Sequence, residues 1–268
     1  RRLRLLAGPA IFGVAASAAS GQSLGAPGRI VWWGETSSNP LLEPPPGVYT
    51  TLAVNSSHGL ALRPDGTMVG WGSNFTGEST PQPGRFTQVA TGHLHSVALR
   101  EDGTAVSWGW NAFGQAVTPP GKFVQVSAGS NISAGIRPDG SIHVWGTQVA
   151  PPPGTYRFVS VGGGGHIGAI RTDGTVVAWG ASAPTTPGTF DAVNINCPAA
   201  GLRTDGTVVT FGSCNAQNFP APPGQFIYLA TASGYPLALR DDFTIAAWGP
   251  HAASVLSVPS GRFSFVAM

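Results

Sequence analysis

The chain has 268 residues, with 38 Gly, 24 Pro and only 10% charged residues. Its hydrophobic fraction of 42%, with eight Trp and 13 Phe, is enough for a packed core and excludes an intrinsically disordered chain. Without the three Arg near the N-terminus, 11 basic residues stand against 12 acidic ones. Such a chain lacks the basic surface that binds phosphates, so we expect no nucleic-acid partner.

The first 20 residues differ from the rest of the chain. Three Arg fall within the first four residues, an apolar run follows at 5–16, and Ala16-Ser17-Ala18 offers small residues for cleavage. This order is typical of a secretory signal peptide, so we expect a leader at 1–20. The apolar run is too short to span a membrane comfortably. We therefore expect an exported bacterial protein, secreted, periplasmic or on the cell surface, without membrane insertion after removal of the leader.

A repeat fills the chain after the leader. Trp-Gly recurs at intervals of 38, 37, 37, 34, 32 and 37 residues, with Phe-Gly in its place once. The aromatic residues of these pairs are Trp33, Trp71, Trp108, Trp145, Trp179, Phe211 and Trp248. Each full unit reads roughly F-x-x-V-A-x-G-x-x-H-S-x-A-L-R-x-D-G-T-V-x-x-W-G and continues into a variable loop that ends in Pro-Gly.

The copy at 86–109 shows how one unit folds. Its β-forming and small residues predict three short strands, and Asp102-Gly103 predicts a hairpin between the second and the third. Pro64 and Pro138 precede the Asp-Gly pair in two other copies. Because Pro cannot donate a ladder hydrogen bond, a type I turn with Gly at a bulge fits better than a two-residue loop.

A unit of this size must stack on its neighbours to bury its faces. We expect an all-β fold, a seven-bladed β-propeller forming one domain at 21–268, with a linear β-solenoid as the alternative. Residues 27–34 match the second half of a unit and 261–268 the first half, with six complete repeats between them. The terminal halves would close the ring. Either the chain continues beyond residue 268 or the last blade lacks a strand.

Two stretches carry a family resemblance. VGWGSNFTGE at 69–78 and VSWGWNAFGQ at 106–115, each preceded by A-L-R-x-D-G, resemble repeats of the regulator of chromosome condensation family. The resemblance implies a seven-bladed propeller. Short repeats in an exported chain are similar to the bacterial branch that includes the propeller-type β-lactamase inhibitory protein. The family founder, an exchange factor for a small GTPase that also contacts chromatin, has longer repeats and basic segments without counterpart here.

The repeat accounts for most charged residues. In every full unit an Arg ends the second strand and an Asp follows two positions later. They are Arg63, Arg100, Arg137, Arg171, Arg203 and Arg240, with Asp65, Asp102, Asp139, Asp173, Asp205 and Asp242. A role repeated six times is structural rather than catalytic. We expect the Asp residues to form turns and the Arg residues to pack and hydrogen-bond between blades.

No residues converge on a metal or a reaction. His58, His95 and His166 share a repeat position where other copies carry Ile, Pro or Tyr, which a metal ligand would not tolerate. His93 would lie on the same strand face as His95, but no third ligand follows. There is no G-x-S-x-G motif, and the Gly run at 162–165 precedes no helix. We expect no metal, no cofactor and no catalytic residue.

The two cysteines occupy one predicted hairpin. Cys197 and Cys214 lie opposite or nearly opposite each other when counted from the Asp205-Gly206 turn. In an exported chain they can form a disulfide, and two free thiols are the alternative.

The candidate binding residues lie in the variable loops, where a rigid scaffold can present aromatic anchors. They are Trp110, Phe113, Phe75, Asn74, Asn111 and Phe219. We expect a monomeric, non-catalytic module that binds a protein as an inhibitor, adhesion or scaffold domain. A carbohydrate-active enzyme using the propeller mouth would need a carboxylate outside the repeat, such as Glu78 or Asp191. Exchange-factor activity like that of the family founder is the other alternative.

Overall fold

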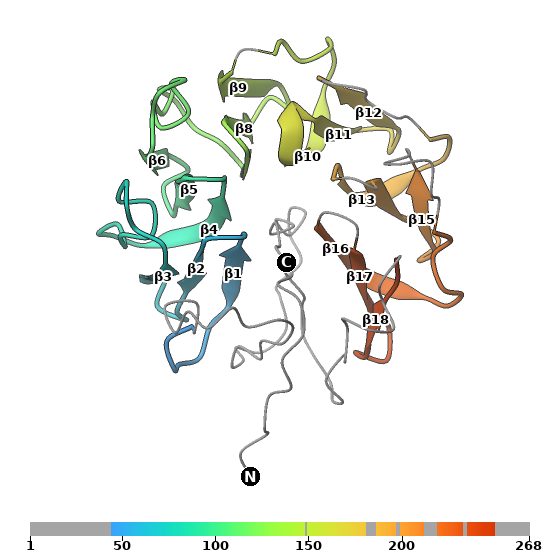
Figure 1. The fold of residues 1–268 in the computed structure, drawn as a ribbon. Coiled ribbons are helices and arrows are strands. Elements are labelled where there is room, and N and C mark those ends of the chain that lie inside the picture. Colours follow the sequence, from blue (N-terminus) through green and yellow to red (C-terminus); the bar gives the residue numbers. More distant parts are fainter. Residues whose placement is uncertain are drawn as a thin grey trace.

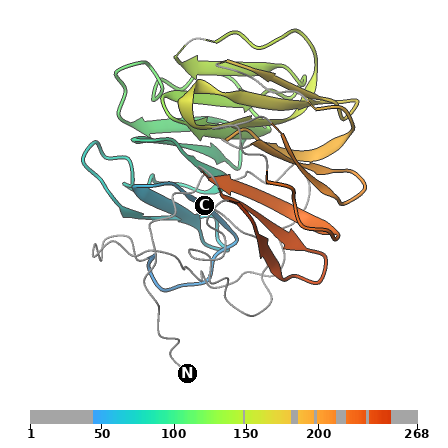
Figure 2. The same cartoon turned by 45° about the vertical axis from the view of Figure 1, so that its right-hand side comes forward.

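The computed structural model describes residues 44–249 apart from 148, 181–185, 197–198, 212–218 and 233–234. In these ranges the chain forms six three-stranded antiparallel sheets. Figure 1 shows them as blades around a central axis, with the first strand of each blade innermost and the third outermost. Figure 2 shows the same ring turned by 45°. The predicted all-β propeller is confirmed, and the ring excludes the linear solenoid.

The blades follow each other in chain order. Their strands, from the centre outward, are β1 (Thr51–Val54), β2 (His58–Leu62) and β3 (Met68–Gly72); β4 (Phe86–Thr91), β5 (His95–Arg100) and β6 (Ala105–Gly109); β7 (Gln125–Gly129), β8 (Ile132–Ile136) and β9 (Ile142–Gly146); β10 (Tyr156–Val161), β11 (Ile167–Arg171) and β12 (Val176–Trp179); β13 (Phe190–Asn194), β14 (Ala199–Arg203) and β15 (Val208–Phe211); β16 (Phe226–Ala232), β17 (Tyr235–Arg240) and β18 (Ile245–Ala247). A short 3-10 turn (Gly163–Gly165) follows β10.

The predicted half-repeats at 27–34 and 261–268, and with them the seventh blade, lie outside the described residues, as does the predicted leader. Across the part of the chain that is described, no helix has the length and apolar character needed to cross a membrane.

The Asp-Gly hairpins have the predicted form. In the second blade Gly103 has a φ of 85° and donates its N–H to the Arg100 carbonyl at 3.0 Å. The Asp102 carboxylate accepts the Thr104 hydroxyl at 2.7 Å and the Thr104 amide at 2.8 Å. These two hydrogen bonds hold the pKa of Asp102 below its ordinary value. The turn is therefore a type I turn followed by a glycine bulge.

The repeat Arg lies over an aromatic ring of its own blade, which corrects the expectation that it bridges blades. The Arg100 guanidinium carbon is 5.1 Å from the centre of the Phe86 ring, and its Nη1 donates to the Pro83 carbonyl at 3.1 Å. The same ring contact pairs Arg137 with Phe123, Arg171 with Tyr156, Arg203 with Phe190 and Arg240 with Phe226. A guanidinium can stack and donate at once, so this one residue fixes the Pro-Gly loop that leads into the blade.

Side-chain amides join the inner strands of neighbouring blades. The inner edge of a blade leaves backbone N–H and C=O groups that its own sheet does not pair. Gln125 in β7 donates its Nε2 to the Val159 carbonyl of β10 at 3.0 Å, and its Oε1 accepts the Val159 N–H at 2.9 Å. The Val126 N–H donates to the Gln88 Oε1 at 2.9 Å one blade earlier. Buried backbone groups at the edge are thereby satisfied across the blade boundary.

A His–Ser contact also joins successive blades. The His58 Nε2 lies 2.9 Å from the Ser96 Oγ, which donates its proton to the Glu78 carbonyl at 2.8 Å. Because the hydroxyl proton is used, the imidazole Nε2–H must be the donor to Ser96. The same arrangement links His95, Ser133 and Gln115. Burial lowers the pKa of His58 and of His95 to about 4. These two histidines are structural.

At the following boundary the polar pair is replaced by an apolar one. Ile132 and Ile167, which stand in the columns of the His and the Ser, share one buried cluster. Elsewhere the blades pack by the same logic, as where Leu60 and Met68 of the first blade meet Phe86 of the second. Apolar burial between facing sheets thus supplies the core of the ring.

Candidate binding face

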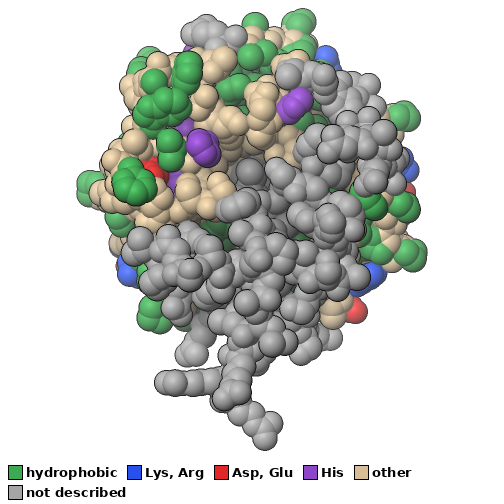
Figure 3. All heavy atoms as spheres, in the orientation of Figure 1, with side chains coloured by type: hydrophobic (Ala, Val, Ile, Leu, Met, Phe, Trp, Pro, Cys, Tyr) green, Lys and Arg blue, Asp and Glu red, His purple; other side chains and the backbone are tan. Residues whose placement is uncertain are grey.

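Three aromatic side chains lie on the two loops that follow β3 and β6. Phe75 is 96% exposed and Phe113 is 51% exposed. The half-buried Trp110 meets the Phe113 ring edge to face, with the ring centres 5.4 Å apart and the planes at 85°. Figure 3 shows hydrophobic side chains gathered over these two loops. Exposed rings on fixed loops are the usual anchors of a binding surface.

A single carbonyl group holds the two loops side by side. The Leu94 carbonyl, in the turn between β4 and β5, accepts the Trp110 N–H at 2.8 Å. The Thr76 Oγ1 lies 3.0 Å from the same carbonyl and 2.7 Å from the Glu78 carboxylate, so its one proton is shared between these two acceptors. Phe75 is the neighbour of Thr76, so the three rings belong to one surface that spans the boundary between two blades. We name residues 73–78, 92–94 and 110–116 the aromatic face.

Asn74 and Asn111 shape the loops rather than extend them outward. The Asn74 Oδ1 accepts the Ser79 N–H and the Thr80 hydroxyl, both at 3.1 Å. The Asn111 Oδ1 accepts the Ala116 N–H at 2.9 Å. Each side-chain oxygen closes its loop by accepting the N–H of the residue five positions later. The two candidate Asn residues therefore position the loops that carry the rings. Their side-chain oxygens are used within the loops, so their amide N–H2 groups are the part left for a ligand.

Phe219 lies apart from the aromatic face. Its side chain is half-buried and packs against a cluster that includes Leu202 and Phe226. Its carbonyl accepts the Thr210 hydroxyl at 2.7 Å, which ties this loop to β15. Cys197 and Cys214, the candidate disulfide partners, lie outside the described residues.

The aromatic face carries no exposed Lys, Arg, Asp or Glu within its three described segments. Its one carboxylate, Glu78, is 0% exposed. Burial by itself would raise the pKa of Glu78, but hydrogen bonds from the Ser73 hydroxyl and from the hydroxyl and amide of Thr76 outweigh it and lower the pKa to about 2. Gln115 occupies the same place in the next loop, where it accepts the Phe113 N–H at 2.9 Å. Glu78 is thus a buried loop anchor.

The charged residues gather at the other end of the strands. The Asp-Gly turns join the second and third strand of each blade, whereas the aromatic face is built from the turn between the first two strands and the loop after the third. Because the direction reverses at each turn, these two sets lie on opposite faces of the ring. In Figure 3, Lys and Arg are visible only along the outer edge of the molecule.

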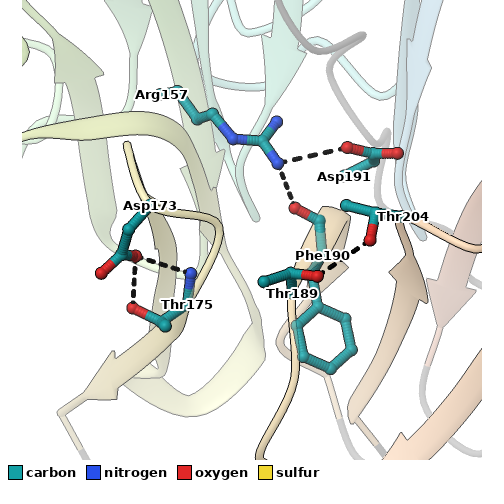
Figure 4. Close-up of polar contacts among 7 residues, drawn as sticks. All are labelled: Arg157, Asp173, Thr175, Thr189, Phe190, Asp191 and Thr204. Carbon is teal, nitrogen blue, oxygen red and sulfur yellow. Dashed lines mark hydrogen bonds and ion pairs between the residues drawn. The ribbon is translucent and has the colours of Figure 1, made fainter.

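The remaining candidates for chemistry are occupied by structural contacts. Figure 4 shows Arg157 of β10 directed at Asp191 of β13, with 3.2 Å between its Nη2 and the Oδ1, and at the Phe190 carbonyl. In the Gly run at 162–165 the Gly163 and Gly164 N–H groups are already donated to side chains. Asp191 is thus an ion-pair partner across a blade boundary, and the Gly run is no phosphate cradle.

The two neighbouring histidines do not share a strand face, which corrects the expectation from their spacing. His93 lies in the turn before β5 and is exposed, whereas His95 begins β5 and is buried. Among the residues that the structure describes, no three His, Cys, Asp or Glu side chains are grouped to hold a metal ion.

Comparison with known proteins shows which of them share this repeat and this fold. The family model of the regulator of chromosome condensation (RCC1) repeat matches residues 86–115, the second blade and its aromatic loop. Curated proteins give no sequence match. The CRINKLY WD40 ectodomain of the Arabidopsis thaliana receptor kinase ACR4 is similar in structure, with 23% identity, a TM-score of 0.64 and coverage of 78% of this chain and 82% of that one.

Two structures of one yeast protein are also similar. Prp20p from Saccharomyces cerevisiae has 16% identity and a TM-score of 0.63, covering 91% of this chain and 82% of its own. Yeast RCC1 (Prp20) bound to Kap60 has 15% identity and a TM-score of 0.61, covering 78% and 74%. Repeat, ring and blade order together define a repeat-built β-propeller. Its second blade matches the RCC1 repeat, and its ring is similar to that of the RCC1 structures.

Proposed function

We propose that this protein is an exported, non-catalytic propeller that binds another protein through its aromatic face. One observation carries the proposal. Phe75, Trp110 and Phe113 are displayed by two loops that share one backbone carbonyl, so the loops are held together before any partner arrives. The Trp110 ring also packs on Phe113, whereas the Phe75 ring projects into solvent. Loops held in place lose little conformational entropy on binding, which favours affinity.

The relatives support a protein-binding role. The structure of Prp20p is described together with its binding to Gsp1p and histones, and the other yeast structure is a complex with Kap60. Those partners belong to the yeast protein, and a shared fold does not transfer them. They do support the view that a propeller of this type serves as a scaffold for protein contacts. The leader predicted at 1–20 and the short repeats support export and the bacterial branch.

The two carboxylates that the sequence offers outside the repeat as enzyme candidates, Glu78 and Asp191, are engaged in structural contacts. Glu78 is buried and accepts three hydrogen bonds, and Asp191 pairs with Arg157. General acid–base chemistry requires a carboxyl group that reaches the substrate. This supports a binding role over a carbohydrate-active enzyme. The exchange-factor alternative rests on the fold and on no feature of the aromatic face.

The test is capture by the full chain from the native culture medium or periplasm, followed by reconstitution with the purified captured protein. We expect Trp110→Ala and Phe113→Ala to weaken that complex at least about tenfold, the loss typical of a central aromatic anchor. Phe243→Gly is the matched control, because Phe243 is an exposed Phe in an Asp-Gly-type turn on the opposite face. A partner that binds all three variants equally well would refute the proposed face, and nucleotide exchange on a small GTPase would refute the proposed class.

A further inference from the structure

The aromatic face offers hydrogen-bond donors, while its side-chain oxygens are largely used as acceptors within the protein; the exposed His93 ring is its other polar group. The Asn74 and Asn111 oxygens accept backbone and hydroxyl donors of their own loops. The Leu94 carbonyl accepts the Trp110 N–H, and Glu78 accepts the Ser73 hydroxyl and the Thr76 N–H. These two acceptors share the Thr76 hydroxyl proton. A ligand that approaches the rings therefore meets few side-chain oxygens able to receive a hydrogen bond.

The donor groups on the same surface are not used in hydrogen bonds within the described part of the chain. Within the described part of the chain, the amide N–H2 groups of Asn74 and Asn111 and the indole N–H of Trp110 have no acceptor. These groups flank the exposed rings of Phe75 and Phe113. The complementary ligand is one that supplies acceptors and apolar faces but few donors.

The charge of the aromatic face further restricts the chemical class of its ligand. It carries no exposed Lys, Arg, Asp or Glu in its described segments, its one carboxylate is buried, and its one exposed ionisable side chain is His93. A charged ligand group placed over the rings would lose hydration without gaining an opposite charge. The surface is thus suited to an uncharged ligand.

From this complementarity we propose that the aromatic face binds an uncharged, proline-rich, extended segment of the partner protein. Proline has a carbonyl acceptor and no N–H donor, and its ring packs against aromatic faces. The polyproline II conformation is largely formed before binding, which reduces the entropy lost. A neutral oligosaccharide fits less well, because each hydroxyl brings a donor that needs an acceptor. This inference rests on the proposed protein-binding role and names the segment that the face recognises.

The test is a titration of the ¹⁵N-labelled full chain with an acetylated, amidated proline decamer. The chain has eight Trp, and the indole N–H signal of Trp110 is identified by its loss in Trp110→Phe. We expect a saturable shift of that signal, at least about tenfold weaker binding by Phe75→Ala, and unchanged binding by Phe243→Gly. Because the face has no exposed Lys, Arg, Asp or Glu and the proline decamer has no charge, affinity is expected to change less than about twofold between about 50 and 500 mM NaCl.

Matched probes separate the competing ligands. A glycine-serine decamer is equally uncharged but keeps its N–H donors, and a neutral hexasaccharide represents glycans. Binding of either probe as tightly as the proline decamer overturns the inference, as does the absence of any saturable shift with the proline decamer. If the proline decamer fails while the captured partner still depends on Trp110, the proposed protein-binding role stands and only the inference falls.

Discussion

Acid should weaken the ring through His58 and His95. Both imidazoles are buried at blade boundaries and bond to a Ser of the next blade. Burial lowers the pKa of each to about 4 in the folded protein, whereas an unfolded His titrates near its ordinary value of 6.5. The unfolded chain therefore binds more protons between these values. Stability contributed by the neutral imidazoles is fully present above pH 6.5 and is lost as the pH falls toward 4.

The size of the effect follows from the two pKa values. For one His, linkage gives a loss of about 3 kcal/mol in the free energy of unfolding between pH 8 and pH 4, so roughly 6 kcal/mol for the two together. That is comparable to the whole stability of many domains. His58→Gln and His95→Gln retain an N–H donor for the Ser hydroxyl but do not titrate.

The measurement is denaturant unfolding at several pH values between 8 and 4 for the wild type and the double variant. We expect the double variant to start less stable at pH 8 and to lose less on acidification. The carboxylates that titrate in the same range are common to both proteins and cancel in the difference. Parallel pH profiles for the two proteins would refute the assignment of His58 and His95 as buried and neutral.

Three further outcomes are expected from the structure. Phe243 takes the glycine position of its turn at a φ of 69°, so Phe243→Gly should raise stability by about 1 kcal/mol, seen as a higher urea midpoint; a lower midpoint would contradict the strain. Gln125→Leu leaves both backbone groups of Val159 without their partners and should cost about 2–4 kcal/mol by the same assay, whereas a loss under about 1 kcal/mol would contradict the edge role. Glu78→Gln, which copies Gln115 of the next loop, should cost about 1–3 kcal/mol because a Gln oxygen cannot accept all three donors; unchanged stability would contradict its role as a loop anchor.

The repeat made the architecture predictable because equivalent residues in successive units must occupy equivalent places. The Trp-Gly period predicts the blades, and Asp-Gly predicts the bulged turns, since both depend on residues close together in the sequence. The group that the repeat Arg contacts is harder to predict from the sequence. A repeated column shows that Arg100 is structural, but stacking on Phe86 and bonding across blades both fit the same spacing.

The His–Ser contact was missed for a different reason. His58 and Ser96 are 38 residues apart and belong to different copies, so reading each copy by itself separates them. A signal was present: each bonded His has a Ser in the next copy, whereas Ile132 is followed by Ile167. In the loops, Trp110 and Phe113 can be recognised from the sequence because they depart from the repeat pattern. The sequence does not predict that Phe219 is half-buried, because its burial depends on the fold of the neighbouring blade.

The carbonyl of Leu94 has an evolutionary consequence. The surface it organises belongs to no single unit, because one loop comes from the first blade, whereas the other loop and the shared acceptor come from the second. Duplication of one repeat would copy only half of it. A recombinant that exchanged the second blade for another would keep the arrangement of stacked blades and lose the aromatic face. Selection on binding would therefore act on adjacent pairs of repeats, and order along the chain would be inherited as a functional trait.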